Sequence, residues 1–232
     1  MANILVTGSS RGIGASIVSA LGAHQVIGHS TATAEGRIAA DLSQPGAAEQ
    51  LWNEALQALG GRIDILVNNA GIFEADPIEQ DHSSWLSNWE RTMQVNLTAA
   101  AELCRLAVLH FRENKGGRIV NVASRAAYRG DSPQHWHYAA SKAGMIGMTK
   151  TIARGYAGEN ILAFAVCPGF TMTGMAEDYL SSRGGSKILA DIPLGRVASA
   201  DEVAETVRWL AIDAPASATG TILDVNGASF VR

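Results

Sequence analysis

Short runs of apolar and β-branched residues alternate along the chain with longer stretches that have helical spacing. The runs are typical of parallel strands buried on both faces. They span Ile4–Val6, Gln25–Gly28, Ile63–Val67, Arg118–Val122, Ile161–Val166 and Thr221–Val225. The helical stretches span Pro45–Leu59, Trp85–Phe111, Tyr138–Tyr156 and Ala200–Leu210. This alternation predicts an α/β fold, a doubly wound parallel sheet in three layers with helices on both of its faces.

The length and composition favour one domain over residues 1–232. The 232 residues are 47% hydrophobic, enough for one sizeable core, and α/β domains of this length commonly stay undivided. The sequence shows neither an internal repeat nor a long linker. We interpret the Gly-rich stretch Ser181–Ser186 as a mobile loop and not as a domain boundary.

The formal net charge of -4 gives no reason to expect nucleic acid or an anionic membrane as a partner, because both reward a concentrated basic surface. No apolar stretch reaches membrane-spanning length, and the N-terminal residues lack the features of a signal peptide. Cys104 and Cys167 lie far apart in apolar runs, which is typical of buried thiols in a reducing compartment. We expect a cytoplasmic protein that acts on a small molecule and needs no metal.

A glycine-rich loop follows the first predicted strand. It reads Thr7-Gly8-Ser9-Ser10-Arg11-Gly12-Ile13-Gly14 and leads into a helical stretch. Glycines in this position permit a tight turn and let backbone amides approach a pyrophosphate at the helix N-terminus. An ordinary strand-to-helix turn is the alternative, but the strand before and the helix after favour a dinucleotide site. The spacing resembles the T-G-x-x-x-G-x-G loop of the short-chain dehydrogenase/reductase family.

Four further positions carry candidate chemistry. Tyr138 and Lys142 are four residues apart, so a helix presents both on one face. An ammonium there would help a tyrosine, whose free pKa is about 10, to exchange protons near neutral pH. Ser124 follows a predicted strand, at the edge where ligands of such folds lie, and Asn96 falls inside a predicted helix. Taken singly, each has a structural alternative: a solvated helix face, a turn serine and an exposed asparagine.

Taken together, the motifs match the short-chain dehydrogenase/reductase family residue by residue over essentially the whole chain. The matching motifs, in order, are the glycine loop, Asn68-Asn69-Ala70-Gly71, Asn96, Ser124, Tyr138 with Lys142, and Pro168-Gly169. The chain is similar to the 3-oxoacyl-acyl-carrier-protein reductases of bacteria within that family. The resemblance implies a Rossmann-like oxidoreductase that moves a hydride between a nicotinamide cofactor and a carbonyl or alcohol, such as a 3-oxoacyl thioester or a small ketone.

The resemblance also implies a role for each catalytic residue. Tyr138 would be the general acid in reduction and the base in oxidation, and Ser124 would hydrogen-bond the substrate oxygen. Lys142 would hold the nicotinamide ribose and lower the pKa of Tyr138. Asn96 would anchor a water that relays protons to solvent.

The implied cofactor contacts lie beyond the strand ends. They are Gly8, Ser10, Arg11, Gly12, Ile13, Gly14, Ser30, Asp41, Leu42, Asn69, Ala70, Gly71, Tyr138, Lys142, Pro168, Gly169, Phe170, Thr171 and Thr173. An NAD-specific site usually offers a carboxylate after the second strand, but this chain has His29-Ser30-Thr31 there. Arg11 is placed to meet a 2′-phosphate, although an exposed loop arginine is the alternative. These features favour NADP(H), and NAD(H) stays open.

The segment between Ser124 and Tyr138 is expected to shape the substrate pocket. It holds Tyr128, Arg129, His135, Trp136 and His137, and the histidines are either substrate-binding groups or parts of a wall. A non-catalytic dinucleotide-binding or regulatory protein of the same fold is the alternative function. The resemblance further implies a homotetramer or homodimer, with packing across subunits through the small residues of the helix that carries Tyr138.

Overall fold

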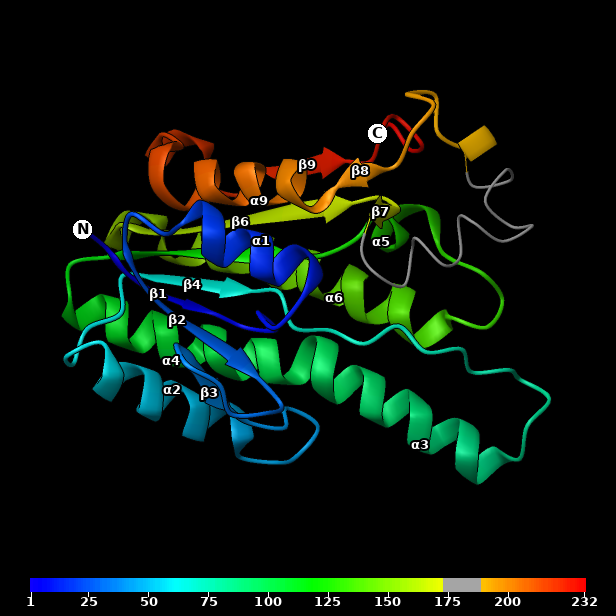
Figure 1. Cartoon of the computed structure of the whole chain (residues 1–232), viewed down its shortest axis with the longest axis horizontal. Coiled ribbons are helices and arrows are strands. Elements are labelled where there is room, and N and C mark those ends of the chain that lie inside the picture. The colour runs from blue at the N-terminus through cyan, green and yellow to red at the C-terminus, as the bar shows by residue number, and fades with distance from the viewer. Residues whose placement is uncertain (173–188) are drawn as a thin grey trace.

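The computed structural model describes residues 1–172 and 189–232, which form a parallel sheet between two layers of helices (Figure 1). The strand order in the sheet is β3-β2-β1-β4-β5-β6-β9, and every neighbouring pair is parallel. The strands are β1 (Asn3–Val6), β2 (Gln25–Ser30), β3 (Arg37–Ala39), β4 (Ile65–Asn68), β5 (Gly117–Val122), β6 (Ile161–Pro168) and β9 (Ile222–Val225). The order reverses its direction at β1, which confirms the predicted doubly wound α/β fold.

The helices cover both faces of this sheet (Figure 1). On one face lie α1 (Gly12–Ala20) and α9 (Ala200–Arg208), and on the other lie α2 (Ala47–Ala58), α4 (Ala99–Glu113) and α6 (Trp136–Tyr156). Side chains of β1 alternate between the two cores: Ile4 and Val6 pack toward α1 and α9, while Leu5 packs toward α2 and α4. Both cores are apolar because the strands have no solvent-facing side.

β6 lies next to the edge strand β9, and every one of its residues is buried. It pairs with β5 and β9, so its backbone groups are satisfied on both edges. Phe164 is fully buried in the core beneath α9. This burial explains why the strand is a continuous apolar run with no polar alternation.

The predicted helix Trp85–Phe111 is longer than expected and contains a π-helical turn. It starts with α3 (His82–Met93), continues through η1 (Gln94–Thr98) and ends with α4. The carboxylate of Asp81 caps it by accepting the backbone N–H of Ser84 at 3.0 Å. The π-helical turn holds Asn96, which is 0% exposed, so the alternative of an exposed asparagine is wrong.

Four short elements were missed by the sequence pattern because they are too short to show a period. They are β3, the helical turn α5 (Ala126–Arg129) and a two-stranded sheet of β7 (Thr171–Met172) and β8 (Ala198–Ser199). The expectation of a mobile loop at Ser181–Ser186 falls outside the described residues. Among the described helices, none is both long and apolar enough to cross a membrane.

Replacing Phe164 with alanine should lower the free energy of unfolding by roughly 3–5 kcal/mol, because the truncation leaves a cavity between β6 and α9. Urea denaturation followed by circular dichroism measures the loss. Leu109→Ala is the matched control, since Leu109 is 45% exposed on α4 and should cost far less. Equal losses in the two variants would contradict the assignment of Phe164 to the core.

Candidate active site

The predicted site residues gather at the carboxyl edge of the sheet, toward which the arrows of the strands point in Figure 1. The glycine loop follows β1, Asn69 follows β4, Ser124 lies two residues after β5, and Gly169 follows β6. The N-terminal part of α6 brings Tyr138 to the same edge. Five separate segments of the chain therefore converge as a consequence of the parallel strand order.

The glycine loop has the geometry of a phosphate cradle. Gly8 has φ +65°, and a Cβ at this position would lie 2.7 Å from the Cα of Ala70. A Cβ on Gly14 would collide with the carbonyl oxygen of Gly8. Within the described residues, no side chain caps the N-terminus of α1 and its first turn holds no acidic residue. Its amides and its positive dipole end therefore fit a pyrophosphate.

The loop is locked to the segment after β4 by Thr7 and Asn69. The hydroxyl of Thr7 accepts the backbone N–H groups of Asn69 and Ala70, both at 3.0 Å. In return, the amide Nδ2 of Asn69 donates to the carbonyls of Thr7 and Gly8, both at 3.0 Å. Asn69 thus supports the cofactor loop, and Thr7 is a site residue that the sequence analysis did not single out.

His29 lies near the end of β2, in the segment where the sequence analysis looked for an NAD-selecting carboxylate. Its buried ring accepts the Gly8 N–H at Nδ1 over 3.1 Å and lies 2.9 Å from the Ala40 carbonyl at Nε2. Burial lowers the pKa of His29, so the ring is neutral with its proton on Nε2. The imidazole therefore holds the glycine loop against β2 and β3, and the neighbouring Ser30 hydroxyl donates to the Ala32 carbonyl at 2.6 Å.

Lys142 is buried at the centre of the site. Its Nζ donates to the Val122 carbonyl at 2.9 Å and lies 5.8 Å from the ring centre of Tyr138. A Cβ on Gly71 would approach this Nζ to 3.5 Å. Burial lowers the pKa of Lys142 to about 8.

Tyr138 and Ser124 lie together in the predicted catalytic group. Burial raises the pKa of Tyr138 to about 12, while a hydrogen bond with the Ser124 side chain acts in the opposite direction. The expected lowering of the Tyr138 pKa by Lys142 stays a prediction, because Lys142 is not among the groups that shift this pKa here. Desolvation of the phenolate is the largest effect on it.

Asn96 is engaged on both sides of its amide. Its Oδ1 accepts the Ile72 N–H at 2.8 Å, and its Nδ2 donates to the Ile72 carbonyl at 3.0 Å and to the Ser141 hydroxyl at 3.3 Å. This bidentate contact fixes the segment that follows Gly71. A water-anchoring role for Asn96 stays a prediction, since its side chain already serves the backbone of Ile72.

The remaining predicted contacts differ in how their side chains are used. The Asp41 carboxylate accepts the N–H and the hydroxyl of Ser43, which lowers the pKa of Asp41, and Leu42 packs into the core beneath α2. The hydroxyl of Thr171 donates to the Gly169 carbonyl at 3.1 Å. Pro168 ends β6 and Phe170 follows Gly169, whereas Thr173 lies outside the described residues.

Arg37 is a candidate cofactor residue that the sequence analysis missed. It pairs in register with Gly28, and a Cβ on Gly28 would collide with Ser9 Oγ and lie 2.9 Å from the Arg37 Cγ. The Arg37 side chain therefore runs beside the glycine loop. Its buried Nε has no hydrogen-bond partner among the described residues. The only sequence signal was the position of Arg37 before Asp41, in a strand too short to recognise.

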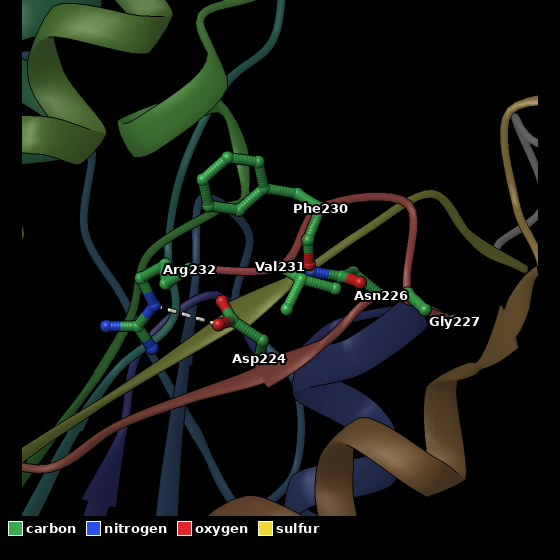
Figure 2. A pocket seen from close by; sticks show the side chains of 7 residues that line it. Asp224, Asn226, Gly227, Phe230, Val231 and Arg232 are labelled. Atoms are coloured by element: carbon green, nitrogen blue, oxygen red, sulfur yellow. Dashed lines mark hydrogen bonds and ion pairs between the residues drawn. The ribbon is translucent and has the colours of Figure 1, made fainter.

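A surface pocket lies elsewhere, around the end of the chain beyond β9 (Figure 2). It is lined by Asp224, Asn226, Gly227, Ala228, Phe230, Val231 and Arg232. In Figure 2 the Arg232 guanidinium meets the Asp224 carboxylate, with 2.9 Å between Nε and Oδ2. None of the predicted catalytic residues lines this pocket. Within the described residues, no group of three or more His, Cys, Asp or Glu is placed to hold a metal ion.

A phosphate cradle beside a Ser–Tyr–Lys group defines a nicotinamide-dependent oxidoreductase that acts on CH–OH or carbonyl groups. A family model described as enoyl-(acyl carrier protein) reductase matches residues 14–228. The chain belongs to the short-chain dehydrogenase/reductase family.

Three relatives illustrate this membership. The chain is 35% identical to the 3-oxoacyl-(acyl-carrier-protein) reductase FabG of Escherichia coli, over 98% of this chain and 96% of the relative. It is 40% identical to FabG of Thermotoga maritima over 72% of this chain and 66% of the relative. It is 35% identical to 3beta-hydroxysteroid dehydrogenase 1 of Eggerthella lenta over 97% and 92%. Relatives of similar sequence identity to this chain are thus named for very different substrates.

Thr7→Val should loosen the glycine loop, because it removes the one hydroxyl that satisfies the amides of Asn69 and Ala70. We expect a loss of about 1–3 kcal/mol in the free energy of unfolding and weaker binding of the nicotinamide dinucleotide. Urea denaturation and a fluorescence titration measure the two effects. Thr151→Val is the control, since the Thr151 hydroxyl only donates to Gly147 on the exposed surface of α6. Unchanged stability and affinity for Thr7→Val would contradict the lock.

Proposed function

We propose that this protein is an NADP(H)-dependent carbonyl reductase or alcohol dehydrogenase in which Tyr138 transfers the proton. The observation that carries the proposal is the convergence of Ser124, Tyr138 and Lys142 beside an uncapped helix N-terminus at one sheet edge. The substrate is a carbonyl compound or the corresponding alcohol. The names of the FabG relatives favour a 3-oxoacyl thioester, and a small ketone is the second candidate.

In the proposed reaction, the bound nicotinamide supplies or accepts the hydride. Tyr138, whose pKa of about 12 keeps it protonated at neutral pH, donates its proton to the carbonyl oxygen as the C=O π bond opens. Ser124 donates a hydrogen bond to the same oxygen and stabilises the charge that develops on it. The balance is C=O plus NAD(P)H plus H⁺ giving CH–OH plus NAD(P)⁺. Lys142 would bind the cofactor ribose from its buried position beside Gly71.

Two cations support the choice of NADP(H). Arg11 is exposed at the N-cap of α1, and Arg37 runs along the other side of Ser9. Guanidinium groups pair with phosphate in a bidentate way and would meet a 2′-phosphate on the adenosine ribose. The place of the usual NAD-binding carboxylate is taken by His29, whose ring is already committed to Gly8 and Ala40.

We further propose a cytoplasmic homotetramer, with a homodimer as the alternative. Exposed Ala143 and Gly147 on α6 and exposed Leu109 on α4 support close approach of a second copy of these helices. Multi-angle light scattering tests the assembly. A mass near 24.4 kDa, that of one chain, would contradict it.

Tyr138→Phe should lower kcat for carbonyl reduction by roughly 100- to 10,000-fold, because the substrate oxygen loses its proton donor. The Kd for NADPH should change less than about threefold, since the aromatic ring and its packing remain. Stopped-flow absorbance at 340 nm and a fluorescence titration measure the two quantities. Unchanged turnover in Tyr138→Phe would contradict the acid/base role of Tyr138. If the unaltered protein bound NADPH but showed no turnover, that result would favour a non-catalytic dinucleotide-binding protein.

Arg37→Ala should raise the Kd for NADPH about tenfold or more and leave the Kd for NADH nearly unchanged, because only the 2′-phosphate is affected. Arg11→Ala is expected to act in the same direction. Isothermal titration with both dinucleotides provides the comparison. Arg105→Ala is the control, a surface change on α4 away from the glycine loop. Equal losses for NADPH and NADH would contradict recognition of the phosphate.

A further inference from the structure

An aromatic corner stands beside the catalytic tyrosine. Phe73, four residues after Asn69, packs with the ring of His135, with 3.9 Å between ring centroids and 5° between planes. The same Phe73 ring meets Tyr138 at 4.8 Å and 80°. Two rings of this corner thus stand nearly perpendicular, and one of them carries the reacting hydroxyl. Phe73 is nevertheless 52% exposed, so much of its surface stays open to a ligand.

The corner is held in place by the backbone on both sides. The Asn96 side chain hydrogen-bonds both the N–H and the carbonyl of Ile72, the residue just before Phe73. On the far side, the Asp76 N–H donates to the Gln134 carbonyl at 2.8 Å, which ties this segment to the one that carries His135.

The imidazole that supports Phe73 is itself fixed. His135 Nδ1 lies 2.7 Å from the Ser132 hydroxyl, and the next histidine, His137, hydrogen-bonds the backbone of Glu74. Burial lowers the pKa of His135, so a neutral ring lies against Phe73 at neutral pH. The aromatic surface is therefore preorganised and costs little ordering entropy when a ligand binds.

From this geometry we propose that Phe73 is a specificity-determining residue that selects carbonyl substrates bearing a flat ring next to the C=O group over straight-chain ones. The proposal rests on the proposed function, since it concerns the substrate of the same site. A planar group can stack on the open surface of Phe73 while its carbonyl meets Tyr138 and Ser124. A flexible alkyl chain buries less area against that surface and loses more rotational freedom on binding.

Two matched 3-oxo esters test the proposal: ethyl benzoylacetate, which has a phenyl ring on the ketone, and ethyl 3-oxohexanoate, which has a propyl chain. We expect the unaltered protein with NADPH to show the higher kcat/KM for the phenyl compound. Phe73→Leu should lower that kcat/KM by about tenfold and change the value for the propyl compound less than about threefold. Phe73→Tyr should retain the preference because it keeps the ring.

Ile78→Ala is the control, since Ile78 is 53% exposed in the same connection but lies outside the aromatic corner. It should leave both kcat/KM values and their ratio unchanged. An equal loss for both esters in Phe73→Leu, or a preserved ratio, would overturn the proposal while the proposed function stands. If the unaltered protein reduced neither ester nor any other carbonyl compound with NADPH or NADH, the proposed function itself would fail.

Discussion

The site depends on one constraint, the hydrogen-bonded lock between the end of β1 and the end of β4. Thr7 and Asn69 make two hydrogen bonds with each other across these neighbouring strands, and two more join Thr7 to Ala70 and Asn69 to Gly8. The Gly8 and Ser9 N–H groups of the loop are already bound to His29, whereas no side chain of the described residues caps the N-terminus of α1, so the positive end of that helix is left for a phosphate. The lock also fixes the start of the segment that ends in Phe73. The cofactor side and the substrate side of the edge therefore share one anchor.

A second, fully buried network connects this edge to the catalytic helix. Asn68 Nδ2 donates to Asn121 Oδ1 at 2.9 Å, and Asn121 Nδ2 donates to the Thr149 hydroxyl at 2.8 Å. These three residues belong to β4, β5 and α6, which carry Asn69, Ser124 and Tyr138 at their edge-facing ends. Buried polar groups are costly unless they are paired, so the ladder permits one register of α6 against the sheet. Precise placement of Tyr138 thus follows from polar contacts well below the site.

Much of the fold, and the gathering of the candidate catalytic residues at one sheet edge, could be predicted from sequence, for different physical reasons. Strands such as β6 can be recognised in the sequence because burial on both faces requires a continuous apolar run. The Tyr138–Lys142 spacing is a property of one helix and needs no tertiary information. In contrast, β3 and α5 are stabilised by neighbouring elements and have no recognisable sequence pattern of their own. The contacts made by the side chains of Thr7, His29 and Arg37 join segments that are distant in sequence. The pKa of Tyr138 likewise depends on desolvation, which is set by the whole fold and not by the local sequence.

Burial disfavours the charged forms of both Tyr138 and Lys142 at the centre of the site. A phenol with a pKa of about 12 beside an amine with a pKa of about 8 means that, at neutral pH, both groups hold their protons. Tyr138 is thereby ready to donate, which suits reduction of a carbonyl, and oxidation of an alcohol requires the proton to leave a site that resists phenolate. A positive charge near the phenol would stabilise the phenolate, and alcohol oxidation would then become easier. The oxidised nicotinamide ring carries such a charge, whereas the reduced ring does not, so the redox state of the cofactor would itself tune the tyrosine toward the direction it serves.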